Sequence, residues 1–273
     1  MLAIKKSNPL QTVTQVRDRD RERAFVKVLH DNSIDHMHIT KTCAGFFHQH
    51  NYYLLCEIAD NSLQHLMSHS SPNIISLEDT TRESWLKTQI SGLASAVHRL
   101  HEPGPRLTAQ LHDIKPDNIL VFNRYDHRLK LADWGCAQAQ PYRNTRAHSP
   151  ANDWRGNPGY HPPESAGDHS TSRKHVFSSL GCVYIELMVC FFEGIVARQS
   201  FLVNITRENR KSDCFHGHQR IVQLSPTVRG KLNNYKSDHR SWVTLLRTVE
   251  KMLVLAPQDR ISAKKLVHEL KFG

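Results

Sequence analysis

The sequence predicts an α+β fold in two parts, a small strand-rich part over residues 1–60 and a larger helical part over residues 61–273, together one domain. Short apolar runs typical of strands fall in the first part, whereas apolar residues at the period of a helix dominate the second. Between these patterns, residues 119–132 have the sequence of a β-hairpin.

Strands in the first part are expected at residues 2–4, 44–47 and 52–57, because each is a short apolar or aromatic run. One helical pattern lies between the first two runs, near residues 21–29. The chain is expected to turn helical again from Asn61 onward.

The predicted hairpin has two short strands and a polar turn. Residues 119–122 are the first strand, residues 123–127 are turn-like, and residues 129–132 are the second strand. Because a hairpin returns the chain to where it began, Asn118 and Asp133 at its two ends should lie side by side.

Helices dominate the second part. Residues 84–101 place apolar side chains at steps of four, three, four and three, which predicts a helix with one buried face. A further stripe covers residues 242–253, and a last helix is expected to start near Ser262, a suitable N-cap. Residues 198–236 are polar and weakly patterned, so no element is predicted there.

Residues 180–196 are apolar enough to suggest a membrane span. However, they include Glu186 and Glu193, and a charge near the membrane midplane is costly. We therefore expect a buried core helix and no membrane partner.

The composition excludes several classes of protein. With 39% hydrophobic and 23% charged residues, the chain can bury a core and is not expected to be disordered. The net charge of +10 suits anionic partners, but the lysines and arginines are scattered, so no dedicated nucleic-acid surface is expected. The six cysteines contain no C-x-x-C pair, which predicts buried thiols in a reducing compartment.

The nineteen histidines have no metal-ligand spacing, so no zinc site is expected. The apolar stretch within residues 1–6 is too short for a signal peptide. An intracellular protein of the cytoplasm or nucleus is therefore expected.

Residues 111–118, L-H-D-I-K-P-D-N, hold polar side chains suited to phosphoryl transfer. That reaction needs a carboxylate to orient the attacking hydroxyl, oxygen ligands for Mg²⁺, and positive charge near the transferred group. Asp113 is the candidate carboxylate, Lys115 the candidate positive charge, and Asn118 with Asp133 the candidate metal ligands. Each residue alone is more simply a turn-capping side chain, but the four together favour the catalytic interpretation.

Several motifs resemble those of the eukaryotic protein kinase family, over about residues 5–270. The similar segments are L-H-D at residues 111–113 with Asn118 (catalytic loop), D-W-G at 133–135 (the metal-binding D-F-G motif), G-N-P-G-Y-H-P-P-E at 156–164 (end of the activation segment), S-L-G-C at 179–182 (central helix) and P-Q-D-R at 257–260 (a late motif).

The resemblance implies a two-lobed kinase fold, with a small lobe built on an antiparallel sheet and a large helical lobe. It implies ATP and Mg²⁺ as cofactors and proteins with serine or threonine as substrates, because Lys115 is the family's choice for serine/threonine kinases. It also implies a structural ion pair between Glu164 and Arg260. The amino-acid sequences of the motifs are most similar to those of fungal kinases.

A nucleotide site is implied by the same resemblance. Residues 2–5, L-A-I-K, are similar to the strand whose lysine reaches the α- and β-phosphates, which implies this role for Lys5, with Lys6 as the rival in register. Glu22 opens a helical pattern and is the implied partner of Lys5, unless it is only one charge in the run of residues 17–23.

Residues 56–59 resemble the hinge that binds adenine through its backbone, which implies this role for Glu57 and Ala59. Ala3 above and Leu120 below would then enclose the base, unless both are plain core residues.

The chain departs from the family pattern at its start. It begins at what would be the third strand, so the first two strands are missing, and no G-x-G-x-x-G occurs that would cover the phosphates. A true absence and an incomplete gene model both remain open as explanations.

Supporting residues of the catalytic loop also depart from the pattern. Leu111 and His112 replace the usual His and Arg, so the arginine that pairs with an activation-loop phosphate is absent. A phosphate on an activation-loop residue could instead bind neighbouring arginines. The candidate phosphorylation sites are Thr145 and Ser149, and the neighbouring arginines are Arg143, Arg146 and Arg155. Val176 and Ser178 stand where the central helix normally opens with Asp and Trp, which is expected to loosen the catalytic loop.

The leading interpretation is a protein serine/threonine kinase. The main alternative is a pseudokinase scaffold, because the Gly-rich loop is missing and Val176 replaces a supporting aspartate. A small-molecule phosphotransferase shares an H-x-D-x-x-x-x-N loop, but Lys115 and the Glu164–Arg260 pair favour the protein kinases. A basic nucleic-acid binder would explain the charge but none of the motifs.

Overall fold

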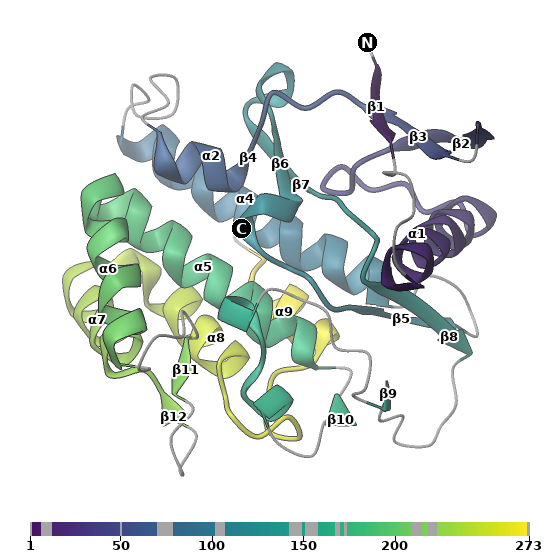
Figure 1. Ribbon diagram of the computed structural model, residues 1–273. Coiled ribbons are helices and arrows are strands. Elements are labelled where there is room, and N and C mark those ends of the chain that lie inside the picture. Colours follow the sequence, from purple (N-terminus) through teal and green to yellow (C-terminus); the bar gives the residue numbers. More distant parts are fainter. Residues whose placement is uncertain are drawn as a thin grey trace.

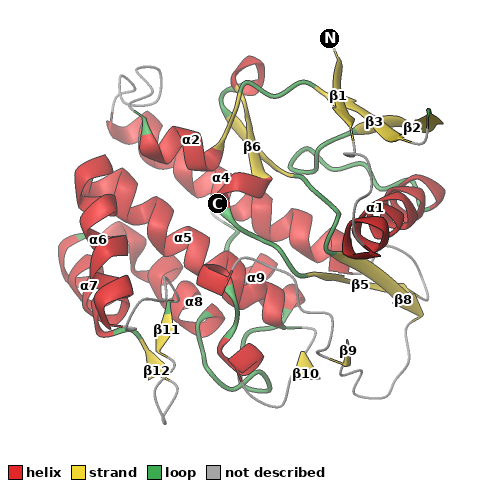
Figure 2. Cartoon of the chain, in the orientation of Figure 1, coloured by secondary structure: helices red, strands yellow, loops and turns green. Residues whose placement is uncertain are grey.

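The computed structural model describes residues 2–6, 13–49, 51–69, 79–101, 107–141, 149–150, 158–166, 170–171, 174–208, 215–217 and 223–271. An antiparallel sheet and a long helix form the amino-terminal part of the described chain, and helices make up most of the remainder (Figure 1). Figure 2 shows helices α5 to α9 gathered on the side of the molecule away from β1, β2 and β3. The predicted α+β fold is confirmed, whereas the division near residue 60 stays a prediction.

The amino-terminal sheet has the strand order β1-β3-β2 and is antiparallel throughout. Its strands are β1 (Leu2–Lys6), β2 (Thr42–His48) and β3 (Asn51–Glu57), and each covers one predicted run. Lys5 on β1 lies opposite Leu54 on β3. Helix α1 (Val13–Asp31) includes the predicted residues 21–29 and buries Phe25.

The hairpin predicted over residues 119–132 is confirmed. Strand β6 (Ile119–Phe122) pairs antiparallel with β7 (Arg128–Leu131), with Ile119 opposite Leu131. Its open end is closed by Ala132, whose backbone N–H donates to the carbonyl of Asn118 at 2.9 Å.

The helix expected from Asn61 starts two residues later. Asn61 and Ser62 form strand β4 (Asn61–Ser62), which pairs with β6, and helix α2 (Leu63–Ser68) follows. The Ser62 hydroxyl caps α2 by accepting the backbone N–H of His65 at 3.2 Å. The short strand β4 forms because it can pair with β6. This pairing depends on a tertiary contact that the local sequence does not indicate.

Six longer helices follow in the described chain. They are α4 (Asp79–His101), α5 (His175–Glu193), α6 (Ile195–Glu208), α7 (Pro226–Asp238), α8 (Val243–Met252) and α9 (Ala263–Glu269). The stripe predicted on residues 84–101 faces the core, because its five members are fully buried: Leu86, Ile90, Leu93, Val97 and Leu100. Ser262 caps α9 as predicted.

Helix α5 runs through the centre of the helical part (Figure 1), and its residues from His175 to Val189 are all buried. Among the described helices it has the length and apolar composition of a membrane span, but 83% of that stretch is buried within the protein, as expected of a core helix. The predicted single run over residues 180–196 is broken at Gly194, whose φ of 88° lies in the left-handed region that favours glycine.

Several elements carry no clear sequence signal. Helices α6 and α7 lie in the segment for which no element was predicted. Strand β5 (Leu107–Leu111) pairs with β8 (Ala137–Pro141), and neither was predicted. The remaining short elements are β9 (Ser149–Pro150), β10 (Ser170–Thr171), β11 (His216–Gly217), β12 (Gln223–Leu224) and the 3₁₀ turns Pro116–Asn118, Asn123–Tyr125, Pro158–Tyr160, Pro163–Ala166 and Arg240–Trp242.

Candidate active site

Two strand pairs bring the predicted catalytic residues together. The β5–β8 pair places Leu111 opposite Ala137, and the β6–β7 hairpin starts directly after Asn118 and ends at Leu131, two residues before Asp133. The loop after β5 and the turn before β8 therefore lie side by side. Asp113, Asn118 and Asp133 line the same small cavity between them.

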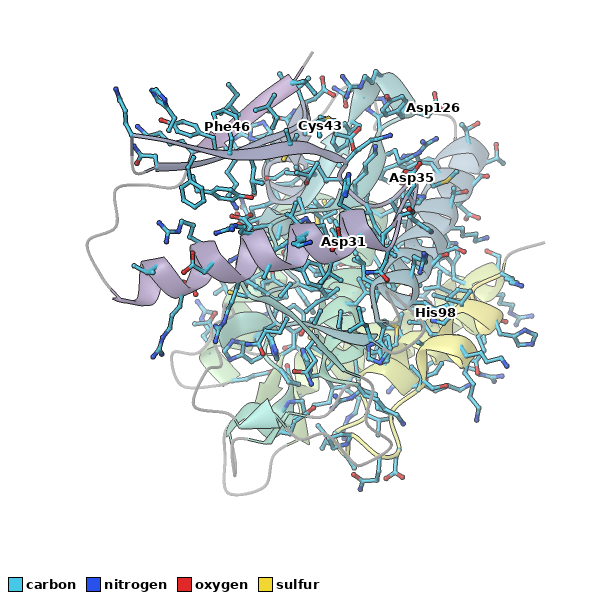
Figure 3. The ribbon with its side chains drawn as sticks, turned by 90° about the vertical axis from the view of Figure 1, so that its right-hand side faces the viewer. Asp31, Asp35, Cys43, Phe46, His98 and Asp126 are labelled. Carbon is cyan, nitrogen blue, oxygen red and sulfur yellow. The ribbon has the colours of Figure 1, made fainter. Side chains whose placement is uncertain are left out.

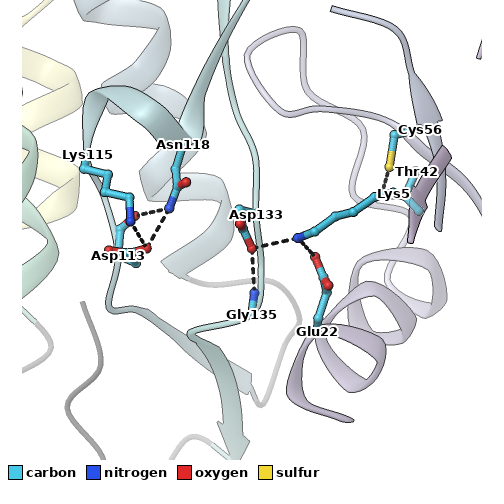
Figure 4. Close-up of polar contacts among 9 residues, drawn as sticks. All are labelled: Lys5, Glu22, Thr42, Cys56, Asp113, Lys115, Asn118, Asp133 and Gly135. Atoms are coloured by element: carbon cyan, nitrogen blue, oxygen red, sulfur yellow. Dashed lines mark hydrogen bonds and ion pairs between the residues drawn. The ribbon is translucent and has the colours of Figure 1, made fainter. Parts of the chain in front are cut away.

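The Asp113 carboxylate is held by two neighbours from its own loop (Figure 4). The Lys115 ammonium donates to Asp113 Oδ2 at 2.7 Å, and Asn118 Nδ2 donates to the same oxygen at 2.8 Å and to the Asp113 carbonyl at 2.9 Å. Pro116 opens a 3₁₀ turn that carries Asn118 back toward Asp113. The loop therefore fixes the direction in which the carboxylate points.

Lys5 lies between two carboxylates from distant parts of the chain. Its ammonium is 2.7 Å from Glu22 Oε1 on α1 and 3.0 Å from Asp133 Oδ1 (Figure 4). Lys6, the rival in register, instead has its ammonium 5.9 Å from the centre of the Tyr53 ring. The predicted contact between Lys5 and Glu22 is confirmed, and the Lys5 side chain is 45% exposed, so other groups can still reach it.

Burial and charge set the protonation of this trio. Burial raises the pKa of Asp133, but the charge of Lys5 and the hydrogen bonds from Lys5 and from the Gly135 N–H outweigh burial and hold that pKa below its usual value. Burial would lower the pKa of Lys5, but Glu22 and Asp133 raise it above its usual value. Burial raises the pKa of Glu22, and Lys5 offsets this only in part. Asp133 is therefore an ionised carboxylate at neutral pH.

Asp133 has an unusual backbone conformation. Its φ of 61° lies in the left-handed region, which costs a residue other than glycine on the order of 1–3 kcal/mol, although aspartate tolerates this region better than most. Such conformations concentrate at functional sites because the surrounding structure must hold them in place. Two contacts stabilise this conformation of Asp133. The Gly135 N–H donates to Asp133 Oδ1 at 3.2 Å, and the Lys5 ammonium donates to the same oxygen.

The donor set suits a magnesium ion. Asn118 uses its amide nitrogen on Asp113, which leaves its amide oxygen for a cation, and Asp133 contributes a carboxylate on the same cavity. Mg²⁺ prefers such sparse oxygen ligands, completed by phosphates and water. Within the described part of the chain no group of three or more His, Cys, Asp and Glu side chains could hold a metal ion.

The predicted hinge connects β3 with β4. Glu57 is the last residue of β3, and its backbone N–H donates to the Lys41 carbonyl at 3.1 Å. Ala59 follows in the connecting loop, Ala3 lies on β1 opposite Cys56, and Leu120 lies on β6. The adenine-binding roles of these four residues stay predictions.

The family model described as protein kinase domain matches residues 1–271, nearly the whole chain. The chain belongs to the protein kinase domain family. No curated protein matches the sequence.

The kinase domain contains the ion pair that the resemblance implied. Arg260 is fully buried and donates to both carboxylate oxygens of Glu164, at 2.9 and 2.8 Å. Its remaining hydrogen bonds go to backbone carbonyls of Val254, Leu255 and Lys174. Thr145 and the three arginines considered for an activation-loop phosphate lie outside the described residues.

The kinase domain contains a second ion pair with little exposure to solvent, which the sequence analysis did not predict. Glu57 accepts hydrogen bonds from the Lys130 ammonium at 2.6 and 2.8 Å and from the Lys41 backbone N–H at 2.9 Å. Both charged side chains of this pair are nearly buried, 12% and 8% exposed. This ion pair joins the end of β3, where the hinge is predicted, to the hairpin that lies between Asn118 and Asp133. A signal was available, because Lys130 is a charged residue between two leucines of β7, Leu129 and Leu131, that are buried.

The cysteines of the kinase domain are less buried than predicted. None of the five described cysteines forms a disulfide; Cys182 is buried, three are half-buried, and Cys43 is exposed on β2 (Figure 3). Burial, followed by the charges of Asp113 and other nearby aspartates, raises the pKa of Cys136 to about 11. Cys214 lies outside the described residues.

Cys136 is therefore expected to resist alkylation, because the reactive thiolate is scarce at pH 8. We expect iodoacetamide at pH 8 to modify Cys43 well before Cys136, measured as a time course of peptide masses. Labelling in denaturant is the control and should modify all cysteines at similar rates. Equal rates for Cys43 and Cys136 in the folded protein would contradict the raised pKa.

Proposed function

We propose that this kinase domain transfers the γ-phosphoryl group of ATP to serine and threonine hydroxyls of proteins, as an intracellular enzyme of the cytoplasm or nucleus. The observation that carries the proposal is the Asp113 carboxylate, held by Lys115 and Asn118 on the cavity that it shares with Asp133. Lys115, two residues after Asp113, favours serine and threonine over tyrosine by the family resemblance.

Each residue has a distinct part in the proposed reaction. Asp113 accepts a hydrogen bond from the substrate hydroxyl and points its oxygen at the γ-phosphorus. The bond from that oxygen to phosphorus forms as the bond to the β–γ bridging oxygen breaks, ADP leaves, and the hydroxyl proton passes to Asp113. Lys115 offsets negative charge on the transferred group, because its ammonium lies 2.7 Å from Asp113.

The nucleotide is held from the other side of the cavity. Lys5, oriented by Glu22, would reach the α- and β-phosphates, and Asn118 and Asp133 would hold magnesium. A magnesium ion held there would supply positive charge that offsets the negative charge of the phosphates. In the proposed site the backbone of Glu57 and Ala59 binds adenine, with Ala3 and Leu120 on its two faces.

Asp113→Ala is the direct test. We expect phosphate transfer to a mixture of serine- and threonine-containing peptides to fall at least ~100-fold, the usual contribution of a general base. Binding of Mg-ATP, measured as a rise in melting temperature, should survive because Asp113 does not hold the nucleotide. Asp31→Ala removes an exposed carboxylate at the end of α1 and should leave transfer unchanged. Transfer that survives Asp113→Ala contradicts the mechanism.

A pseudokinase scaffold is the second candidate. It is favoured by the start of α5, where Val176 is apolar and the buried Ser178 hydroxyl has no hydrogen-bond partner among the described residues. Binding of Mg-ATP that is lost in Asp133→Asn, without any transfer by the unaltered protein, would support this candidate over the enzyme.

A further inference from the structure

We infer that His175 is a positioning residue, which holds the catalytic loop to the start of α5 at the place where Val176 stands instead of an aspartate. This inference rests on the proposed function, because it assigns His175 a part in keeping Asp113 aligned. His175 is the first residue of α5 and is completely buried.

The first contact is a hydrogen bond to the backbone. His175 Nε2 lies 2.9 Å from the Leu111 carbonyl oxygen, and both groups are buried. A carbonyl only accepts, so Nε2 carries the hydrogen and donates. Leu111 is the last residue of β5 and lies two residues before Asp113. The bond therefore fixes the peptide from which the catalytic loop departs.

The second contact is a ring stack with the next residue of the loop. The rings of His112 and His175 are 4.5 Å apart and nearly parallel, at 4°. Burial lowers the pKa of His112 well below its usual value, and positive charge on His175 or Arg21 acts in the same direction. His112 is therefore neutral at physiological pH, so the stack carries no charge repulsion. One side chain thus contacts two consecutive loop residues, Leu111 through its backbone and His112 through its ring.

The helix end that carries His175 is itself fixed. The Lys174 ammonium donates to the carbonyls of Gln258 and Arg260 at 3.0 and 2.5 Å, and the Arg260 guanidinium donates to the Lys174 carbonyl at 3.1 Å. The Val176 side chain has no polar atom, and Ser178 Oγ makes no hydrogen bond to a described residue. In the described first turn of α5, the polar contact with the catalytic loop is thus made by His175.

Two substitutions separate the hydrogen bond from the ring. His175→Phe keeps an aromatic ring against His112 but removes the donor. His175→Gln removes the ring but keeps an amide N–H that can reach the Leu111 carbonyl. His38→Phe is the matched control, because His38 is also buried and its Nδ1 lies 2.7 Å from a backbone carbonyl, that of Leu129, away from the catalytic loop.

We expect His175→Phe to lower kcat roughly 10- to 100-fold, as small misplacements of a catalytic group do, with the KM for ATP unchanged. Amide hydrogen exchange in the peptide covering residues 107–119 should become at least ~10-fold faster. His175→Gln should restore most of both values. His38→Phe should lower the melting temperature without changing kcat or the exchange of that peptide.

The exchange measurement separates this inference from the proposed function. If the unaltered protein transfers no phosphate, the proposed function fails, while faster exchange in His175→Phe alone still supports the anchoring contact. If His175→Phe leaves both kcat and exchange unchanged, the inference is overturned. It is also overturned if His175→Gln is as impaired as His175→Phe, because the hydrogen bond is then not the cause.

Discussion

Arg260→Ala is expected to lower the free energy of unfolding by about 3–5 kcal/mol, the usual cost of removing one partner of a buried ion pair. The Arg260 side chain is 0% exposed, and the substitution leaves Glu164 and three backbone carbonyls without their donor. Since single domains are stable by about 5–15 kcal/mol in total, this loss is a large fraction of the stability that a domain has.

Urea unfolding measures this loss, and a double-mutant cycle assigns it. Glu164→Gln alone should also destabilise the fold, because it leaves the fully buried Arg260 without its counter-charge, although Gln keeps an amide oxygen that can accept one of the hydrogen bonds. The two substitutions together should cost clearly less than the sum of the single effects. Arg247→Ala on the exposed side of α8 is the control and should change stability by less than ~0.5 kcal/mol. A loss below ~1 kcal/mol for Arg260→Ala would contradict the importance of the pair.

Arg198→Ala on α6 should be comparably destabilising, by about 3–5 kcal/mol. The guanidinium is 3% exposed and donates to Glu186 on α5 at 2.7 Å and to Gln64 on α2 at 2.8 Å. Glu186 is 0% exposed and also accepts the hydroxyl of Tyr160 at 2.6 Å. Without Arg198, a buried carboxylate would lack its counter-charge.

The effect of Arg198→Ala should depend on pH in a definite direction. Burial already raises the pKa of Glu186 above 4.5, and Arg198 is the main influence that lowers it. Removing Arg198 raises the folded-state pKa further above the unfolded value. The difference in stability from the unaltered protein should therefore be larger at pH 8 than at pH 5, where protonation of Glu186 relieves the buried charge.

Unfolding curves at the two pH values test this. Arg207→Ala, an exposed arginine on the same helix, is the control and should show a small effect without pH dependence. Replacing both Glu186 and Arg198 by methionine should restore part of the stability, because a buried pair exchanged for apolar groups is often neutral. A loss that is equal at both pH values would contradict the charge-based explanation.

Much of the candidate site could be predicted from sequence because its geometry is local. The hairpin that joins Asn118 to Asp133 spans few residues, so the turn and the two apolar strands determine the approach of its ends. The Lys5–Glu22 and Glu164–Arg260 pairs are distant in sequence and were implied only by the family motifs.

The missed elements depend on tertiary contacts. Strands β5 and β8 are stabilised by each other across more than twenty residues, and the A-Q-A-Q-P sequence of β8 has little intrinsic strand preference. Helix α7 buries Val228, Leu232 and Tyr235 at steps of four and three, a pattern that polar neighbours obscure. The contact of His175 with the catalytic loop has no sequence signal, because it joins a helix start to a strand end 64 residues earlier.

Lys174 and Arg260 donate hydrogen bonds to each other's backbone carbonyls, and this contact affects how activity-based genetic screens of this domain should be interpreted. The loop around Arg260 borders the peptide of Lys174, whose next residue is His175. Mild substitutions in that loop are thus expected to act remotely, slowing turnover in molecules that still fold. A screen scored by activity alone would count such positions among the catalytic residues, although the hydrogen bonds of the Arg260 side chain go to Glu164 and to backbone carbonyls outside the catalytic loop.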